Sequence, residues 1–225
     1  MTSRWARDKV NGRASTKNPG RFFSPSGWGS RYSFEPMKTR ESGMPDEEIW
    51  ATFFDPASIL EKLGLVAGIG DVVEFGCGYG TFTLPAARLC HGTIHAFDIE
   101  SVMVERVRSK ATREGLVNIA CSVRDFVVEG TGIPDGTADY AMVFNILHAE
   151  CPKMLLGEAH RVLRPGGRLG IIHWNYDPTT PRGPSMPIRP RPEQLRAEVE
   201  SVGFQDVGGG RDRSAAVPLR IGVGP

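Results

Sequence analysis

The sequence VVEFGCGYGTF, residues 72–82, places an acidic side chain near the end of an apolar strand and then three glycines at alternate positions. A glycine-rich turn after a strand is typical of nucleotide sites, because bare backbone and a helix N-terminus approach the ligand there. The spacing, however, is G-x-G-x-G, and Thr81 stands where a dinucleotide fingerprint has its third glycine. Glu74 would repel a pyrophosphate and attract an amino group or another cation. The segment therefore predicts a strand-end site for a ligand with a positively charged end.

Strand-like and helix-like segments alternate from residue 45 onward, which predicts an α/β fold with helices on both faces of a mainly parallel sheet. Ser101 is the expected N-cap of one helix, and Arg164-Pro165-Gly166-Gly167 is expected to end another. The expected strands are 71–75, 93–99, 117–123, 138–147 and 168–174, with 204–209 and 217–223 as a final antiparallel pair. The expected helices are 45–54, 55–64, 80–90, 101–115, 152–163 and 192–203.

The composition is that of an ordinary globular protein: 225 residues, 40% hydrophobic and 24% charged, enough for one substantial core. No apolar run approaches the roughly 18 residues of a membrane span, so a cytoplasmic protein without a membrane partner is expected. Its four cysteines form no CxxC pair and no cluster with zinc spacing, so no metal site is expected.

Residues 1–40 carry a net charge of +7, whereas the remainder carries −6. We expect a basic, flexible N-terminal arm, followed by one domain over residues 41–225 whose first part, 41–66, forms helices and a lid. The arm's interleaved aromatic residues would suit contact with RNA or DNA. A targeting segment, an over-long start ahead of Met37 or Met44, and a tail folded over a pocket are the alternatives, and these are favoured because no nucleic-acid module accompanies the arm.

Two further acids follow the next two strands. Asp98 ends the second strand 22 residues after Gly76, where an acid commonly binds a ribose diol. Asp125 follows the third strand, with Phe126 beside it, where a carboxylate can accept a hydrogen bond from a base amine. The alternatives are a helix cap for Asp98 and an ordinary loop acid for Asp125. Together the acids describe a ligand with a ribose, a base and a cationic end, but no phosphate.

That ligand is S-adenosylmethionine, and the sequence resembles the class I S-adenosylmethionine-dependent methyltransferases. The resemblance lies in VVEFGCGYGTF, AFDIE, VRDF, DGTADYAMVFNILH and EAHRVLRPGGRLGIIHW, over roughly residues 60–175. It implies a Rossmann-like doubly wound sheet of seven strands with the last strand antiparallel. It implies that Glu74, Gly76, Gly78 and Gly80 face the methionine part, Asp98 the ribose, Asp125 and Phe126 the adenine, and that Asn145 lies at the methyl-transfer face. Cys77 and Ile99, beside these residues, are also expected to bind the cofactor.

Two histidines are candidate catalytic residues. His148 and His173 follow the fourth and fifth strands at the carboxyl edge, where open α/β sheets bind ligands, and either could act as a general base. Either could instead be a wall of the pocket, and that interpretation is favoured for His173. Glu150 is a weaker candidate, because an acid at a helix start is often a cap.

The acceptor is predicted to be a small molecule, methylated at O, N, S or C, as the resemblance implies. The Asn/Asp-Pro-Pro-Tyr/Phe tetrapeptide of nucleobase methylation is absent, and the segment reads FNILHAE instead. The alternatives are an RNA- or protein-directed enzyme recruited by the basic arm, and a relative that binds the donor without catalysis. A hypothetical apolar lid, or ordinary packing, would comprise Met44, Trp50, Phe53, Met186 and Ile188. Arg182, Arg189 and Arg191 either pair with an acidic acceptor or stay solvated.

Overall fold

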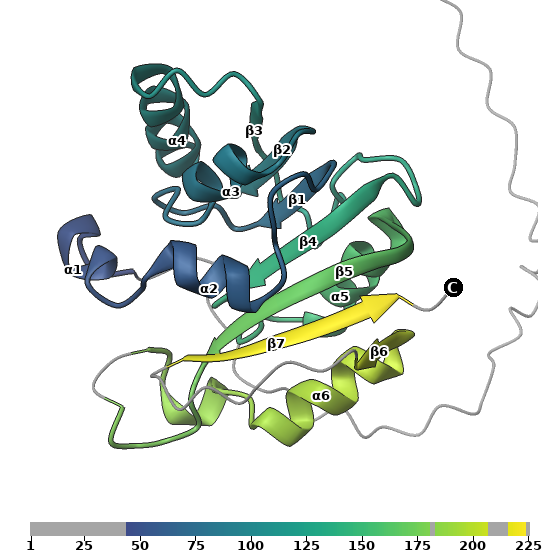
Figure 1. Cartoon of the computed structure of the whole chain (residues 1–225). Coiled ribbons are helices and arrows are strands. Elements are labelled where there is room, and N and C mark those ends of the chain that lie inside the picture. The colour runs from purple at the N-terminus through teal and green to yellow at the C-terminus, as the bar shows by residue number, and fades with distance from the viewer. Residues whose placement is uncertain (1–43, 181–182, 207–215, 224–225) are drawn as a thin grey trace, which may run out of the picture. The chain divides into compact units, whose positions relative to one another are not determined.

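The computed structural model describes residues 44–180, 183–206 and 216–223, the last segment by its backbone alone (Figure 1). The predicted basic arm, residues 1–40, lies outside the described residues. Within the described part, no helix is both long enough and apolar enough to span a membrane.

Five parallel strands form the centre of the fold: β1 (Val72–Phe75), β2 (Ile94–Asp98), β3 (Ile119–Val123), β4 (Ala138–Phe144) and β5 (Leu163–Trp174). They pair in the order β3-β2-β1-β4-β5. The chain moves from β1 to one side of the sheet and then returns to the other side at β4. Ligands bind in open α/β sheets at such a reversal, outside the carboxyl ends of the strands. The predicted Rossmann-like α/β class is confirmed.

Two C-terminal segments extend this sheet. The backbone of β7 (Ala216–Val223) pairs antiparallel with β5, and β6 (Phe204–Asp206) pairs antiparallel with β7. The segment 207–215 that joins them lies outside the described residues. The count of seven strands with an antiparallel last strand therefore stays a prediction.

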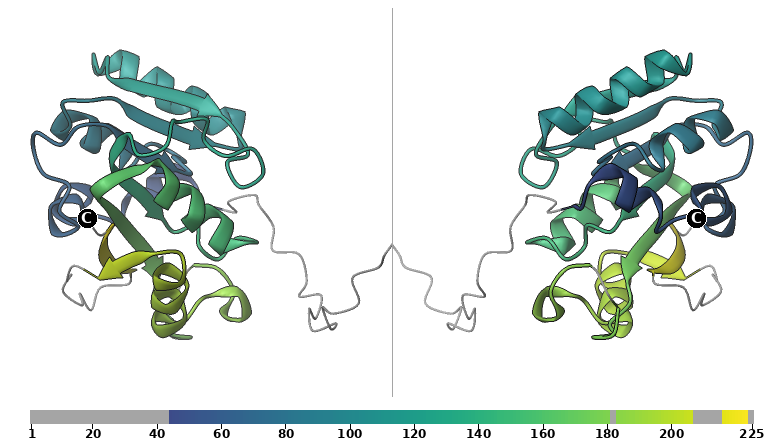
Figure 2. Two further views of the ribbon diagram at one scale, coloured as in Figure 1. Left: turned by 90° about the vertical axis from the view of Figure 1, so that its right-hand side faces the viewer. Right: turned by 90° about the vertical axis from the view of Figure 1, so that its left-hand side faces the viewer.

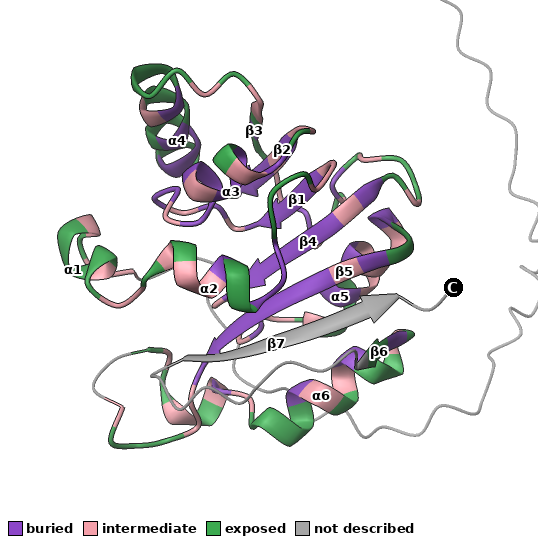
Figure 3. Cartoon of the chain, in the orientation of Figure 1, coloured by how far each residue is buried: buried purple, intermediate pink, exposed green. Residues whose placement is uncertain are grey.

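Helices cover both faces of the sheet, as the two turned views of Figure 2 show. The six α-helices are α1 (Glu47–Ala51), α2 (Pro56–Lys62), α3 (Thr83–Leu89), α4 (Ser101–Arg113), α5 (Pro152–Val162) and α6 (Pro192–Ser201), and η1 (Met186–Ile188) is a short 3-10 turn. Successive side chains of a strand point to opposite faces. Val72 accordingly packs with α2, α3 and α4, whereas Val73 packs with α5 and α6. Figure 3 shows the buried sheet between these two layers.

Two element boundaries differ from the prediction. The expected cap at Ser101 is wrong: the N-cap of α4 is Glu100, which makes no side-chain capping bond. A nearby acid orders this turn instead, because Asp98 Oδ1 accepts a hydrogen bond of 2.9 Å from the Glu100 amide. Strand β5 begins at Leu163, five residues before its predicted start, so the Arg164–Gly167 turn lies within the strand, beside an irregular register in β4.

We expect Gly170→Ala to destabilise the fold strongly. A Cβ atom at Gly170 would lie 2.0 Å from Tyr140 Oη, and Tyr140 is completely buried with its hydroxyl donating to the Leu63 carbonyl at 3.0 Å. Overpacking of this kind costs about 1–3 kcal/mol or more. Urea unfolding measures the loss. Gly157→Ala in α5 is the matched control, since nothing lies within 4 Å of its Cβ and helical alanine gains up to ~1 kcal/mol. Equal effects of the two substitutions would contradict this packing.

Candidate active site

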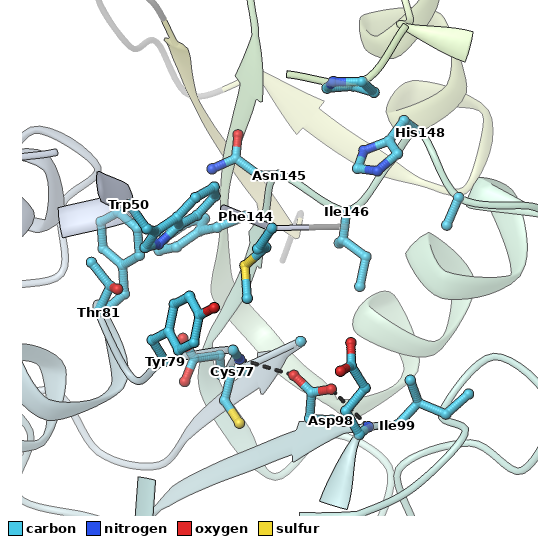
Figure 4. A pocket seen from close by; sticks show the side chains of 18 of the residues that line it. Trp50, Cys77, Tyr79, Thr81, Asp98, Ile99, Phe144, Asn145, Ile146 and His148 are labelled. Atoms are coloured by element: carbon cyan, nitrogen blue, oxygen red, sulfur yellow. Dashed lines mark hydrogen bonds between the residues drawn. The ribbon is translucent and has the colours of Figure 1, made fainter. Parts of the chain in front are cut away.

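A cavity of about 340 Å³ opens at the carboxyl edge of the parallel strands. Figure 4 shows side chains from the glycine loop, from the end of β2 and from the end of β4 that project into it. Ten of the twelve residues predicted for the site line this cavity: Glu74, Gly76, Cys77, Gly78, Asp98, Ile99, Asp125, Phe126, Asn145 and His148. Gly80 and His173 are not among its lining residues. The topology thus brings together residues that are up to 74 positions apart in the sequence, from Glu74 to His148.

The glycine loop follows β1 directly and needs its glycines for two reasons. Gly76 and Gly78 have φ values of 79° and 48°, in the left-handed region that other residues avoid. A Cβ atom would also lie 2.9 Å from Ile146 Cδ1 at Gly76 and 3.0 Å from Met44 Cε at Gly78. Gly80 has a φ of 78°, but its missing side chain faces Val107 of α4, 3.2 Å away. Gly80 therefore lies on the side of the loop that packs against α4 and does not line the cavity.

Glu74 is an acid held inside the sheet, with only 3% of its surface exposed. The Thr83 hydroxyl donates a hydrogen bond of 2.5 Å to its Oε2 atom. Burial is the main cause that raises the pKa of Glu74 from 4.5 to about 8; the Thr83 hydrogen bond opposes this shift, and the neighbouring Cys121 and Asp98 add to it. The ionised form is therefore costly at neutral pH unless a cation lies beside it.

Asp98 joins the glycine loop to the start of α4. Its Oδ2 accepts a hydrogen bond from the Gly78 amide and its Oδ1 one from the Glu100 amide, both at 2.9 Å (Figure 4). Burial raises the pKa of Asp98, although these amides oppose the shift. The carboxylate thus orders the turn, as the helix-cap alternative supposed, and also faces the cavity.

The third acid lies farther along the strand edge. Asp125 begins a turn, and its Oδ1 accepts a hydrogen bond of 3.2 Å from the Val128 amide. Phe126 beside it is buried and packs edge-on against Phe75, with ring centroids 5.4 Å apart. Ile99 is 40% exposed and also lines the cavity. This end of the cavity combines an acid with apolar surface, as a nucleobase site requires.

Cys77 lines the cavity as a neutral thiol. Its Sγ lies 3.8 Å from the Sγ of Cys121 in β3. This contact and burial both raise the pKa of Cys77. A thiol that stays protonated is a poor nucleophile, so Cys77 acts as part of the wall.

Asn145 stands at the end of β4 in an unusual conformation. Its φ is 55°, and its backbone amide donates to the Ile172 carbonyl at 2.7 Å. Both side-chain polar atoms, Oδ1 and Nδ2, are buried without a hydrogen-bond partner among the described residues. Buried polar groups are nearly always satisfied, so this amide and its strained backbone indicate a ligand-binding position.

His148 and His173 lie together, but only the first faces the cavity. Their rings are 5.7 Å apart at an angle of 71°. His173 is 3% exposed, and its Nδ1 lies 3.2 Å from the Trp174 carbonyl oxygen. His148 therefore has access to a bound molecule, while His173 packs behind it.

Apolar and aromatic side chains complete the lining of the cavity, and some of them were not predicted from the sequence. Met44, Trp50, Phe53 and Ile188 were predicted and line the cavity, whereas Met186 does not. Phe144 and Trp174 also line it. Their signal was their position at the carboxyl ends of β4 and β5, where parallel strands present side chains to a ligand.

Arg189 does not fit the predicted alternatives of an anion-binding or a solvated arginine. It is 6% exposed, and its guanidinium donates to the carbonyl oxygens of Asn175 and Pro184, each at 2.8 Å. The charge thus holds the loop after β5 in place. Arg191 lies over the ring of Tyr176, 4.2 Å from its centroid, and Arg182 lies outside the described residues.

Comparisons with known proteins agree with this geometry. Residues 72–167 match the family model described as a methyltransferase domain. The chain is 30% identical over 139 residues to aklanonic acid methyltransferase DauC of Streptomyces sp. strain C5, covering 56% of this chain and 62% of that protein. Residues 72–167 thus match a methyltransferase domain, and the relatives and the fold together support a class I S-adenosylmethionine-dependent methyltransferase.

A further curated protein and a solved structure extend the comparison. Sterol 24-C-methyltransferase of Yarrowia lipolytica is 26% identical over an alignment of 198 residues. The alignment covers 81% of this chain and 50% of that protein. A crystal structure of a SAM-dependent methyltransferase from Aquifex aeolicus superimposes with a TM-score of 0.68 at 22% identity, over 79% of this chain and 94% of that chain. The chain spans 62% of the length of the aklanonic acid methyltransferase and 50% of the length of the sterol methyltransferase. Among the described residues, no cluster of three or more His, Cys, Asp or Glu is placed to hold a metal ion.

The raised pKa of Glu74 makes a prediction about stability. The folded protein keeps the Glu74 proton up to a pH of about 8, whereas the unfolded chain releases it near 4.5. The stability from this group is complete below pH 4.5 and is lost as the pH rises through about 8. We expect the free energy of unfolding of the ligand-free protein to fall with pH over this window, by at most about 1.4 kcal/mol per pH unit.

Glu74→Gln removes the titrating group and keeps an acceptor for the Thr83 hydroxyl. Urea unfolding at several pH values between 5.5 and 8 measures both proteins. The difference in stability between variant and wild type should grow with pH in favour of the variant. A constant difference would show that the Glu74 pKa is not raised.

Proposed function

We propose that this protein transfers a methyl group from S-adenosylmethionine to a small-molecule acceptor, leaving S-adenosylhomocysteine. The observation that carries the proposal is the buried Glu74 carboxylate in a cavity that is also lined by Asp98, at the end of β2, and by Asp125, just after β3. The donor has one positively charged end, a ribose and a base, which match these three acids in order. The relatives named for aklanonic acid and for a sterol support a small-molecule acceptor.

The donor residues divide by chemistry. The amino end would bind at Glu74, beside the bare backbone of Gly76, Cys77 and Gly78, with Gly80 supporting the loop. Asp98 would accept hydrogen bonds from the ribose, with Ile99 against it. Asp125 would accept one from the adenine amine, and Phe126 would pack on the ring. The Asn145 amide, whose polar atoms are buried without a partner among the described residues, would bind at the methyl-transfer face.

When bound, the donor supplies an electrophilic methyl group on a sulfonium. The work of the protein is then to position the acceptor in line and to exclude water. His148 would accept the acceptor's proton where that proton has a high pKa. His173, packed against the His148 ring, would fix its orientation. No metal is assigned a role.

The sequence and the similarity to methyltransferases also support proposals about the strand count, the domain bounds and the cellular location. The C-terminal pair β6 and β7 completes a sheet of seven strands whose last strand is antiparallel. Residues 41–225 form the catalytic domain, and residues 1–40 form a separate basic arm. The protein acts in the cytoplasm.

Asp98→Asn tests the ribose assignment. We expect the dissociation constant of S-adenosylhomocysteine to rise at least about tenfold, because a charge-assisted hydrogen bond is worth roughly 1.5–3 kcal/mol. Isothermal titration calorimetry measures it. Asp135→Asn is the matched control, since that side chain is 82% exposed on the surface. Unchanged affinity in a folded Asp98→Asn protein would remove Asp98 from the site, and absence of binding by the wild type would overturn the proposed function.

His148→Gln tests the role of the general base. A screen of small acceptors with isotopically labelled donor identifies a methylated product first. With that acceptor, we expect turnover to fall about 100-fold or more, since general-base catalysis contributes roughly 10²–10⁴. Donor affinity, measured by calorimetry, reports whether the variant still folds around the site. Unaltered turnover would make His148 a wall residue, and donor binding without turnover on any acceptor would indicate a non-catalytic relative.

A further inference from the structure

The donor assigned above leaves one part of the cavity unfilled. Glu74, Asp98 and Asp125 lie on the side formed by β1, β2 and β3. The opposite side is formed by the aromatic wall, which we define as Trp50 and Phe53 of the α1 segment and Trp174 at the end of β5. In Figure 4, Asn145 and His148 project from the end of β4 across the cavity from Asp98 and Ile99.

The three rings of the aromatic wall touch one another. The centroid distances are 6.1 Å for Trp50 and Phe53, 6.3 Å for Trp50 and Trp174, and 5.7 Å for Phe53 and Trp174, with interplanar angles of 70° to 76°. Edge-to-face contacts fall in this range. A cation-binding cage needs its rings spread so that a cation fits between them, within about 6 Å of each centroid. The wall is therefore a continuous apolar surface.

Further aromatic residues hold the wall in place. Phe54 lies 5.0 Å from Trp50 and 5.5 Å from Phe82, and Phe82 in turn lies 4.8 Å from Phe144. Rings fixed by neighbours on several sides lose little further freedom when a ligand binds. The structure thus offers a preformed surface on which a flat ring can pack, which is how a site gains affinity at low entropic cost.

The charges around the cavity exclude one class of acceptor. The acidic residues that line it are Glu74, Asp98, Glu100 and Asp125, which all lie at the ends of β1, β2 and β3. Among the described residues that line the cavity, the polar side chains on the side of Trp50 and the end of β4 are Tyr79, Thr81, Asn145 and His148, and none is an acid (Figure 4). A protonated amine would find no countercharge there, which argues against a cationic acceptor.

The position of His148 in the cavity narrows the class of acceptor again. A phenol, whose pKa is about 10 as in tyrosine, gives its proton to an imidazole far more readily than an aliphatic alcohol does. An aromatic hydroxyl is neutral at pH 7 and is carried on a flat ring. Both properties match this half of the cavity.

We propose that the acceptor is a flat aromatic molecule with a phenolic hydroxyl, packed on the wall of Trp50, Phe53 and Trp174 with its hydroxyl toward His148. This proposal rests on the proposed methyltransferase function. A bond forms between the hydroxyl oxygen and the methyl carbon while the sulfur–methyl bond breaks. The electron pair of the broken bond stays on sulfur, which becomes a neutral thioether, and the hydroxyl proton passes to the His148 ring.

Calorimetry on the complex with S-adenosylhomocysteine tests this proposal with three probes. 2-Naphthol is flat and phenolic, decahydro-2-naphthol has the same skeleton without aromatic rings, and phenyltrimethylammonium carries a permanent positive charge. We expect saturable binding of 2-naphthol, about three- to tenfold tighter than that of decahydro-2-naphthol, and no saturable binding of the cation. Equal or tighter binding of either comparison probe would overturn the inference, as would failure of 2-naphthol to bind.

Two variants locate the probe. Trp50→Ala should raise the 2-naphthol dissociation constant at least about tenfold, and Trp50→Phe should restore most of the affinity, since both aromatic rings supply a stacking face. Tyr176→Ala is the control, because Tyr176 is an aromatic residue on the loop after β5 that does not line the cavity. Unchanged affinity in Trp50→Ala would overturn the wall assignment. Absence of S-adenosylhomocysteine binding by the wild-type protein would instead count against the proposed function.

Discussion

A carboxylate buried in the central strand of the sheet is the constraint on which this site depends. Glu74 lies in β1, between β2 and β4, with Ala96 and Met142 opposite it in the two pairings. Burial raises its pKa to about 8, so in the empty site the acid keeps its proton at neutral pH and its ionised form is costly. A ligand that brings a positive charge relieves this cost, whereas a phosphate would increase it. The residue thus selects the class of ligand by electrostatics before any shape is considered.

The turn after β1 and the Asp98 carboxylate shape the cavity that Glu74 lines. The turn that follows β1 consists of glycines at the two positions where a Cβ would meet Ile146 or Met44. Asp98 holds this turn through the Gly78 amide while it faces the same cavity. If Asp98 binds the donor as proposed, donor binding and local folding share one hydrogen-bond network. Removing any part of it would affect both.

The acceptor side is built differently, and this difference shows what a sequence can predict. Glu74 and Asp98 lie in the last residues of β1 and β2, and Asp125 lies two residues after β3, so their spacing predicted that they line one cavity. The aromatic wall joins the α1 segment to β5, more than 120 residues apart in the sequence; the position of Trp174 at a strand end indicated the cavity, but no local pattern indicated its contact with Trp50 and Phe53.

Other differences between the sequence predictions and the structure also come from contacts between residues far apart in the sequence or from local packing. Gly80 and His173 lie behind the cavity because of the side chains that pack on them, which no spacing records. The N-cap of α4 is Glu100 and not Ser101, because the Asp98 carboxylate binds the Glu100 amide and orders the turn one residue earlier. Arg189, expected near solvent or a substrate, is buried by the carbonyl groups of its own loop. Each outcome depends on a tertiary contact that competes with a local preference.

The protons exchanged when S-adenosylmethionine binds test the central role of Glu74 most directly. Titration calorimetry at pH 7 in buffers of different ionisation enthalpy gives this number. If the Glu74 pKa is about 8 in the free protein and falls when the cationic end binds, most of one proton is released per donor. The Glu74→Gln variant should release none. Binding by the wild type without proton release would contradict the account.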